Sequence, residues 1–495
     1  MKSILQQTKT EKTITISEIA YLIYFAIMFG ARAAGLYEGM LLYNLTLIAG
    51  MLFFALKMAL TKHTVLEYLL TGGLLLLSLV IYKNTGEKGL LLYFTMFLGM
   101  KGLSVKRIFK WAAMILGTCF TVLVFLSVTG VIQDIYYIHN RTGFGEVMRR
   151  SLGYPYPNTL FTTYIILMVL IMYMLGRQKL KNLLLTSFCM LLGSIYLYIY
   201  SCSNTGLIVS VFYLCVNFYL QLRPKLSVME KIGLFLIYPA CLLISIVGPL
   251  TAKGELFTLL DKILHNRVAY SYYYLTNEPI TLFGTRFKEP PDPNYLIDSS
   301  FLYSFLQIGL VAFVILTSIF VYMIYSYIKE ERKLELAIIA AFCLLGLSDP
   351  FFFNLSYKNL MFLFVGEVYY RRMDNLNRKL PKLLSKEIQL LPIGNKEVGY
   401  YSGIYAFLAD KGRTMREKLS DKGLLAMGIY LLTAVILILA AFFVTGGGPV
   451  TGRVDRVEEW EYVRAVLSLG LWGSMVITGI LFFAAIKEKK AGSDV

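Results

Sequence analysis

Long apolar runs, separated by short polar segments, make up most of the chain. A transmembrane helix needs about 20 apolar residues, and strands cross a membrane only as a closed barrel, so these runs predict helices. The predicted spans are 17–36, 39–60, 64–82, 88–103, 109–130, 158–177, 181–201, 204–222, 231–249, 299–327, 334–348 and 356–370, followed by 424–445 and 464–486. The pattern predicts an all-α polytopic membrane protein. We expect about 12 transmembrane helices plus a C-terminal two-helix membrane hairpin.

The composition supports a lipid environment. Hydrophobic residues make up 57% of the 495 residues and charged residues only 16%, whereas soluble domains average about 45–50% and about 25%. The formal net charge of +17 is explained by Lys and Arg at the cytoplasmic ends of spans. Because no basic stripe with interleaved aromatics lies outside the spans, nucleic acid is not an expected partner.

The basic residues also predict the sidedness of the loops. With the N-terminus inside, every inner loop is basic, as the positive-inside rule requires. This topology places both termini in the cytoplasm and two long loops, 131–157 and 250–298, outside. The second loop holds five Lys or Arg and six Asp or Glu, so it lacks the basic excess. Loops of this length are usually functional, and we expect 250–298 to be a partly helical lid over a membrane-facing cavity.

The chain changes character after residue 380. Asn395 is the only asparagine in the last 105 residues, and the apolar positions between Tyr401 and Leu419 share one helical face. We therefore expect a polytopic membrane domain at 1–380, a cytoplasmic basic amphipathic linker at 381–423, and a two-span hairpin at 424–495. The hairpin is either an appended module or a fusion partner.

Two adjacent arginines end the first outer loop. Arg149 and Arg150 stand shortly before Asn158, at the lip of the next span. A guanidinium offers a planar fork of donors that suits a phosphate, so this pair is a candidate phosphate site. A solvated turn whose arginines contact lipid headgroups is an equal alternative.

The second outer loop carries a candidate general base. Asp298 stands at the mouth of the span that begins at Ser299, where a carboxylate can accept a proton from a sugar hydroxyl. An N-cap of that span is the alternative role, and the two roles are compatible. His139 and His265 are rival bases, for which a place on the loop surface is favoured.

No cofactor is expected. The six cysteines lack the spacing of metal ligands such as CxxC, and no Gly-rich phosphate loop is present. The sequence therefore predicts neither a metal site nor a nucleotide site.

Short motifs follow one another in a characteristic order along residues 15–375. They are Arg150–Gly153 with Pro157 and Asn158, Ser203–Gly206, Leu282–Gly284, Ile297–Leu302, Gly309, and the turn from Gly346 to Asn354. This order resembles the signatures of a bacterial superfamily, the capsule and O-antigen repeat-unit polymerases (the Wzy type) and the O-antigen ligases. Tyr156 stands where that family often has histidine, and Asn204 where it often has arginine. Asp298 and Ser299 replace the His-Asn pair of the ligase branch, which favours the polymerase branch.

The resemblance implies a function. The substrates would be polyprenyl-diphosphate-linked oligosaccharides outside the bacterial cytoplasmic membrane, and a growing chain would pass en bloc to a new lipid-linked repeat unit. The lipid bilayer and other polysaccharide-assembly proteins would be the further partners. By analogy, the residues in the site are Asp298 as the base, Arg267 and Arg150 on the diphosphate, Arg149 and Arg286 as helpers, and Asn158, Asn204 and Tyr303 as further substrate contacts.

Three other interpretations remain open. A lipid-linked oligosaccharide flippase or other transporter would also have a dozen spans, although transporters usually show internal repeats and an intramembrane site. An O-antigen-ligase-type transferase would move the glycan to another acceptor. A non-catalytic scaffold for envelope assembly would tolerate loss of the outer arginines.

Overall fold

The computed structural model describes residues 13–141, 145–264, 266–292, 295–352, 357–399, 403–446 and 456–491. Eleven helices in these ranges are long and apolar enough to cross a membrane, and the last two form a C-terminal pair. The chain is therefore an all-α polytopic membrane protein with a C-terminal helix hairpin, as the apolar pattern predicts.

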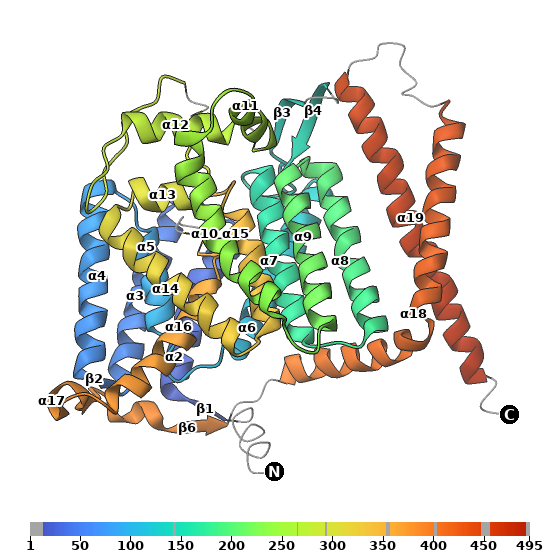
Figure 1. The fold of residues 1–495 in the computed structure, drawn as a ribbon. Helices are drawn as coiled ribbons and strands as arrows, with labels where there is room; N and C mark the ends of the chain where they lie inside the picture. The colour runs from blue at the N-terminus through green and yellow to red at the C-terminus, as the bar shows by residue number, and fades with distance from the viewer. Residues whose placement is uncertain are drawn as a thin grey trace. The chain divides into compact units, whose positions relative to one another are not determined.

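The described residues divide into two compact units (Figure 1). Unit 1 takes residues 13–120, 169–176 and 215–399, and unit 2 takes 121–141, 145–168, 177–214, 403–446 and 456–491. Three helices contribute residues to both units: α6 (Val105–Val128), α7 (Pro157–Leu175) and α9 (Asn204–Leu222). Each unit is described by itself below.

Unit 1 holds most of the helices. Its long helices are α2 (Ile16–Ala33), α3 (Leu41–Leu60), α4 (Val65–Thr85), α10 (Val228–Thr251), α14 (Leu310–Lys329) and α16 (Met361–Asn377). Its shorter helices are α5 (Gly89–Leu98), α11 (Gly254–Ile263), α12 (Arg267–Asn277), α13 (Ser300–Leu306), α15 (Lys333–Leu345), α17 (Lys382–Ser385) and the 3₁₀ turn η1 (Pro392–Asn395). Its short strands are β1 (Thr13–Thr15), β2 (His63–Thr64), β5 (Glu387–Ile388) and β6 (Glu397–Gly399).

Two apolar runs fold as short helices inside unit 1. The predicted spans 88–103 and 334–348 are α5, with 10 residues, and α15, with 13. Tyr93, Phe94 and Phe97 of α5 are fully buried, and α5 packs against α16. A helix that is covered on all sides stays apolar all round without touching lipid. These two runs are therefore apolar because protein surrounds them.

The predicted span 299–327 is in fact two helices. α13 ends at Leu306 and α14 begins at Leu310, and Gly309 between them has φ +93°. A right-handed helix cannot continue through positive φ, so the run breaks at this glycine.

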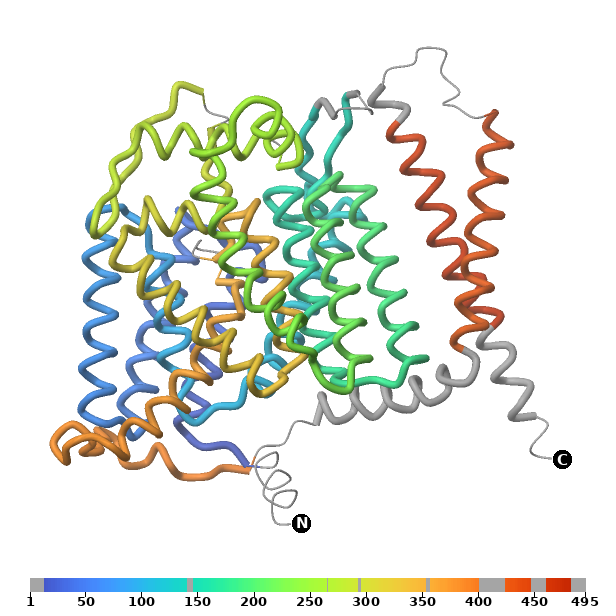
Figure 2. The backbone as a smooth tube through the Cα atoms, in the orientation of Figure 1, coloured from blue at the N-terminus to red at the C-terminus, as the bar shows by residue number. Residues whose placement is uncertain are grey.

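The predicted loop 250–298 is partly helical, as expected. α11 and α12 lie across one end of unit 1, and the backbone then descends toward the end of α4 (Figures 1 and 2). The side-chain amide of Asn84, at the end of α4, donates to the carbonyl of Phe283 at 3.3 Å. We call this end of unit 1 the loop end. A cavity beneath the loop stays a prediction.

The opposite end of unit 1 is tied by strand pairs. β1 pairs antiparallel with β6, and β2 with β5, so the segment from α17 to β6 folds back onto unit 1. This segment lies within the predicted linker 381–423. The side chains of 403–422 lie outside the described part of the chain, so the amphipathic face expected there stays a prediction.

Unit 2 contains a β-hairpin within the predicted loop 131–157. Its strands are β3 (Tyr136–Arg141) and β4 (Gly145–Arg150), which pair with Tyr136 opposite Arg150. Beside it, α8 (Leu180–Ser201) contacts both α18 (Gly403–Val444) and α19 (Arg456–Ala491). The ring of Tyr196 on α8 meets the ring of Trp472 on α19 edge-on at 5.4 Å. The C-terminal hairpin is thus packed into unit 2.

Candidate functional site

Arg267 and Asp298 form an ion pair at the loop end of unit 1. The guanidinium Nη2 lies 2.9 Å from the carboxylate Oδ2, and the side chains are 14% and 31% exposed. Arg267 is the first residue of α12, and Asp298 directly precedes the cap of α13. The loop therefore brings together the two residues that the sequence proposed as phosphate ligand and base.

Local backbone geometry positions Arg267. Asn266 before it adopts φ +67°, which turns the chain sharply between α11 and α12. The carboxylate of Asp261 accepts from the amide of Ala269 at 2.9 Å, which satisfies a free amide at the start of α12. The guanidinium Nη1 of Arg267 donates to the carbonyl of Leu264 at 3.2 Å. Its Nε is buried without a partner in the described structure, so one donor remains unused.

Asp298 does not cap the following helix. Ser299 is the N-cap of α13, and its hydroxyl accepts from the amide of Leu302. The same hydroxyl donates to the hydroxyl of Ser245 on α10 at 2.9 Å. Because Ser299 supplies the cap, the Asp298 carboxylate stays available for Arg267 and for a ligand.

Burial and charge act in opposite directions on Asp298. Burial raises the pKa of its carboxyl group, because a charged carboxylate loses hydration, while Arg267 lowers it. The balance leaves the pKa above its ordinary value. A carboxylate with a raised pKa and partial exposure is suited to accept a proton.

Two glycines let the loop touch the break between α13 and α14. A Cβ on Gly284 would lie 2.2 Å from the carbonyl oxygen of Gln307, and a Cβ on Gly309 would lie 2.2 Å from the amide nitrogen of Gly284. Both glycines have positive φ, +77° and +93°. The space and the backbone angle therefore both require glycine at each position.

Hydrogen bonds complete this contact, which we call the glycine clamp (residues 281–284 against 307–311). The amide of Leu310 donates to the carbonyl of Thr281 at 2.9 Å, and the amide of Val311 donates to Leu282 at 3.1 Å. Free amides at the start of α14 are thus satisfied by the loop. The clamp holds the second half of the loop beside the start of α14.

The aromatic run of α12 packs mainly within the loop. Tyr274 is 5% exposed and forms a small core with Leu302 and Leu306 of α13. Its hydroxyl donates to the carbonyl of Tyr295 at 2.7 Å, which ties α12 to the segment that carries Asp298. Tyr272 is exposed.

The other two candidates of unit 1 differ in access. Tyr303 is 8% exposed and lies near the carboxylate of Glu87. Arg286 is exposed, and its side chain has no ion pair or hydrogen bond with the described residues. Arg286 is thus free to meet an anion, whereas Tyr303 lies in the interior.

In unit 2, Arg149 and Asn158 are bonded to each other. The guanidinium of Arg149, 9% exposed, donates to the side-chain oxygen of Asn158 at 2.7 Å and to the carbonyl of Ser201 at 2.8 Å. The hydroxyl of Ser203 donates to the same Asn158 oxygen at 3.1 Å. This network joins the β-hairpin, the start of α7 and the turn between α8 and α9. The environment favours a bracing role for Arg149.

Arg150 lies between two carboxylates. It is 35% exposed and lies 3.6 Å from Asp134 and 3.6 Å from Glu461 of α19. Distances of this length leave the cation weakly held. Asn204 accepts from the hydroxyl of Tyr198 at 3.1 Å.

The candidates therefore fall into two groups. Arg267, Arg286, Asp298 and Tyr303 belong to unit 1, and Arg149, Arg150, Asn158 and Asn204 belong to unit 2. Of the rival bases, His139 is exposed on β3. His265 lies outside the described residues, as do the last two residues of the last motif, 353–354.

Sequence reasoning missed several partners. Ser245, Glu87 and Glu461 contact candidate residues from far along the chain. Glu461 and Arg464 stand three residues apart, which is a helix-face spacing, but nothing in the sequence names Arg150 as their neighbour.

Comparison of the chain with protein-family models, with curated proteins and with solved structures gives no match.

Proposed function

We propose that the chain is a glycosyltransferase that polymerises polyprenyl-diphosphate-linked oligosaccharide repeat units by en bloc transfer outside the bacterial cytoplasmic membrane. The observation that carries this proposal is the ion pair of Arg267 with Asp298, 2.9 Å apart at one end of a membrane bundle. A cation for a diphosphate and a carboxylate for a hydroxyl proton are the two groups that this transfer needs.

Contacts among the motifs support the proposal. Within unit 1, the amide of Ser300 donates to the carbonyl of Gly346 at 2.8 Å, and its hydroxyl donates to the carbonyl of Asp349 at 2.6 Å. The glycine clamp joins two further motifs of the same unit. The motif that contains Asp298 thus contacts the turn that begins at Gly346, and Leu282–Gly284 contacts Gly309.

The proposed reaction conserves atoms and charge as follows. Asp298 accepts the proton of an acceptor sugar hydroxyl, and the hydroxyl oxygen attacks the anomeric carbon of the donor glycan. The bond between that carbon and the diphosphate oxygen breaks, and the lipid diphosphate leaves with the electron pair. Arg267, with Arg286 of the same unit, stabilises the charge of this leaving group. The leaving group is already activated, so the step uses no nucleotide.

Binding of the donor also activates the base in this proposal. A diphosphate that takes the Arg267 guanidinium removes the cation that lowers the pKa of Asp298. The carboxylate then becomes more basic at the moment when the substrate is in place. The buried Nε of Arg267 has no partner in the described structure, so it gains one if the guanidinium turns toward the phosphate.

The proposed sidedness rests on the basic residues. The positive-inside distribution assigns both termini to the cytoplasm and loops 131–157 and 250–298 to the outer face. The lipid-linked glycans would then reach the loop end of unit 1 from the outer leaflet. Other polysaccharide-assembly proteins are proposed partners.

A ladder assay tests the proposal. The purified protein in detergent receives a polyprenyl-diphosphate-linked oligosaccharide without nucleotide, and the products are separated on a gel. The intact chain should give a ladder spaced by one repeat unit. Asp298→Asn should lower the rate by roughly 10²- to 10⁴-fold, the usual contribution of a positioned base.

Glu289→Gln is the matched control, because Glu289 is an exposed carboxylate of the same loop. It should leave the ladder unchanged. A ladder that survives Asp298→Asn would show that Asp298 is not the base, while the polymerase function would still stand. Transport of the lipid-linked glycan across vesicles, without any ladder, would replace the polymerase with a flippase.

A further inference from the structure

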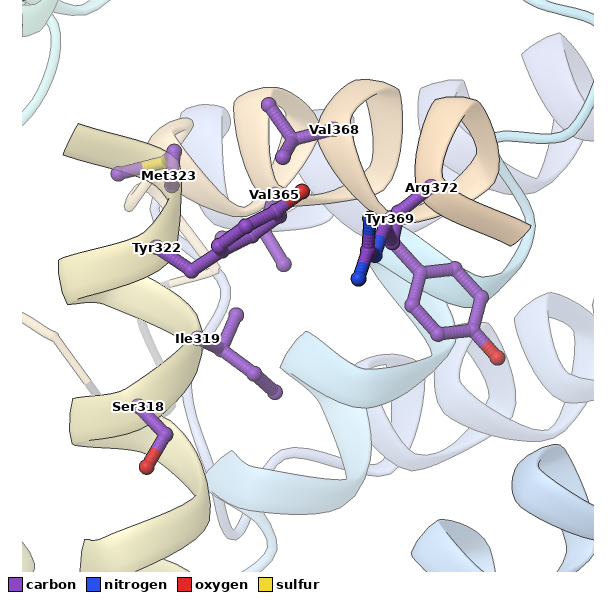
Figure 3. Close-up of a pocket in the computed structure, with 8 residues that line it drawn as sticks. All are labelled: Ser318, Ile319, Tyr322, Met323, Val365, Val368, Tyr369 and Arg372. Atoms are coloured by element: carbon purple, nitrogen blue, oxygen red, sulfur yellow. The ribbon is translucent and has the colours of Figure 1, made fainter. Parts of the chain in front are cut away.

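An apolar cavity opens between α14 and α16 of unit 1 (Figure 3). It measures about 360 Å³, within the size range of ligand pockets. Ile319, Tyr322 and Met323 line it from α14, and Val365 and Val368 line it from α16. Tyr322 is 42% exposed, so the cavity reaches the surface of the unit.

Arg372 lies at the edge of this apolar cavity. It is exposed and makes no hydrogen bond or ion pair with any described residue. Two other arginines of unit 1 are paired with carboxylates: Arg371, next to it in the chain, pairs with Glu330 at 2.5 Å, and Arg332 pairs with Glu335 at 2.6 Å. Arg372 is therefore an unpaired positive charge beside an apolar space.

We propose that this cavity binds an anionic phospholipid, with one acyl chain between α14 and α16 and the phosphate on Arg372. The walls offer the chain aliphatic and aromatic contacts, and an arginine is the side chain best suited to a phosphate. Both helices carry their basic residues at this end, where Lys329 ends α14. Basic pockets between helices are a known form of anionic-lipid recognition.

The charge pattern selects this occupant over others. A zwitterionic lipid would bring a choline or ethanolamine cation close to Arg372. Repulsion between the two positive charges would offset the attraction of the phosphate. A free phosphate would leave the apolar walls empty. The site involves neither Arg267 nor Asp298, so it is independent of the proposed transfer reaction.

Native mass spectrometry of the purified full-length protein tests this inference. Phosphatidylglycerol and phosphatidylcholine with identical acyl chains are titrated into the detergent solution, and bound copies are counted. We expect one saturable binding site for phosphatidylglycerol and weaker binding of phosphatidylcholine. Arg372→Ala should raise the Kd for phosphatidylglycerol about fivefold, as expected for one basic residue near a lipid phosphate.

Two further variants sharpen the test. Ser318→Trp, at an exposed position of the cavity lip, should fill the space and lower binding of both lipids. Arg378→Ala removes an equal charge from an exposed residue outside the cavity and should leave binding unchanged. Melting temperatures confirm that each variant is folded. Equal binding of the two lipids, an equal loss with Arg378→Ala, or full binding by Arg372→Ala would each overturn the inference.

Discussion

The carboxyl group of Asp298 experiences two opposing effects, and their difference decides its protonation. Burial raises its pKa and Arg267 lowers it. A general base works only when deprotonated, so the transfer rate should fall as the pH drops through the pKa of Asp298. Removing the positive charge of Arg267 removes the lowering effect, and the pKa of Asp298 must then rise.

We therefore predict that the acid limb of the pH–rate profile moves to higher pH in Arg267→Gln. The readout is the position of the limb in the ladder assay at limiting donor, where the rate reports the free enzyme in which Arg267 still pairs with Asp298. The height of the profile is no readout, because it falls for any loss of the leaving-group cation. Lys262→Gln, which removes an exposed cation from the same loop, is the control and should leave the limb in place. A limb at the same pH in Arg267→Gln would show that Asp298 is not the base.

At this scale the sequence identified residues but not their surroundings. Arg149 and Arg150 are neighbours in the chain, yet Arg149 is buried in a hydrogen-bond network while Arg150 is partly exposed. Two adjacent arginines in a strand point to opposite faces, and which face is covered depends on elements far away. The choice of Ser299 rather than Asp298 as the cap also depended on a distant residue, Ser245.

Among the elements, the glycine clamp imposes a strict geometric constraint on the loop. It replaces side-chain packing with direct backbone contact between the loop and the start of α14. An added methyl group at Gly284 meets a carbonyl oxygen at 2.2 Å and also a φ that disfavours it. Backbone atoms cannot turn aside as a side-chain end can, so the loop itself must move.

Gly284→Ala should therefore loosen the loop. We expect a loss of about 2–4 kcal/mol in stability, from the strained φ together with the forced displacement. Limited proteolysis should cut within 254–280 faster, and the melting temperature in detergent should drop. Gly248→Ala is the control, since its added Cβ has only one ordinary contact, at 3.8 Å. Equal proteolysis of both variants would show that the clamp does not hold the loop.

The sequence predicted where helices form, but it did not predict which of them contact lipid and which are enclosed by protein. The apolar runs gave the helices, because lipid and protein interior both select apolar residues. For the same reason the runs could not show that α5 and α15 are enclosed by protein. The β-hairpin of unit 2 was missed because its pairing joins two short segments without an alternating pattern.

On the scale of the whole molecule, the C-terminal hairpin is the feature that sequence analysis left most open. In the structure, α19 of this hairpin contributes a buried cation to unit 2. Arg464 is 3% exposed, donates to the carbonyls of Ile199 and Met148, and lies over the ring of Tyr200 at 5.3 Å. The hairpin thus supplies part of the interior of that unit.

We predict that Arg464→Ala destabilises unit 2 by about 2–4 kcal/mol, because two carbonyls lose their donor and Glu461 loses one of its two cations. Thermal unfolding in detergent, followed by the fluorescence of Trp460 and Trp472, measures the effect. Arg177→Ala, at an exposed position of the same unit, should change the melting temperature little. Equal melting temperatures for the two variants would mean that Arg464 contributes nothing to the stability of unit 2.

The glycine clamp also sets a rule for building chimaeras. Residues 254–280 can be exchanged for another loop that keeps Arg267 paired with Asp298 without disturbing the clamp, because the backbone contacts of the clamp begin only at Thr281. An exchange that runs past Thr281 brings a foreign backbone against residues 307–311. It succeeds only if the same source protein supplies both segments of the clamp. The border between transplantable and non-transplantable sequence therefore lies inside the loop.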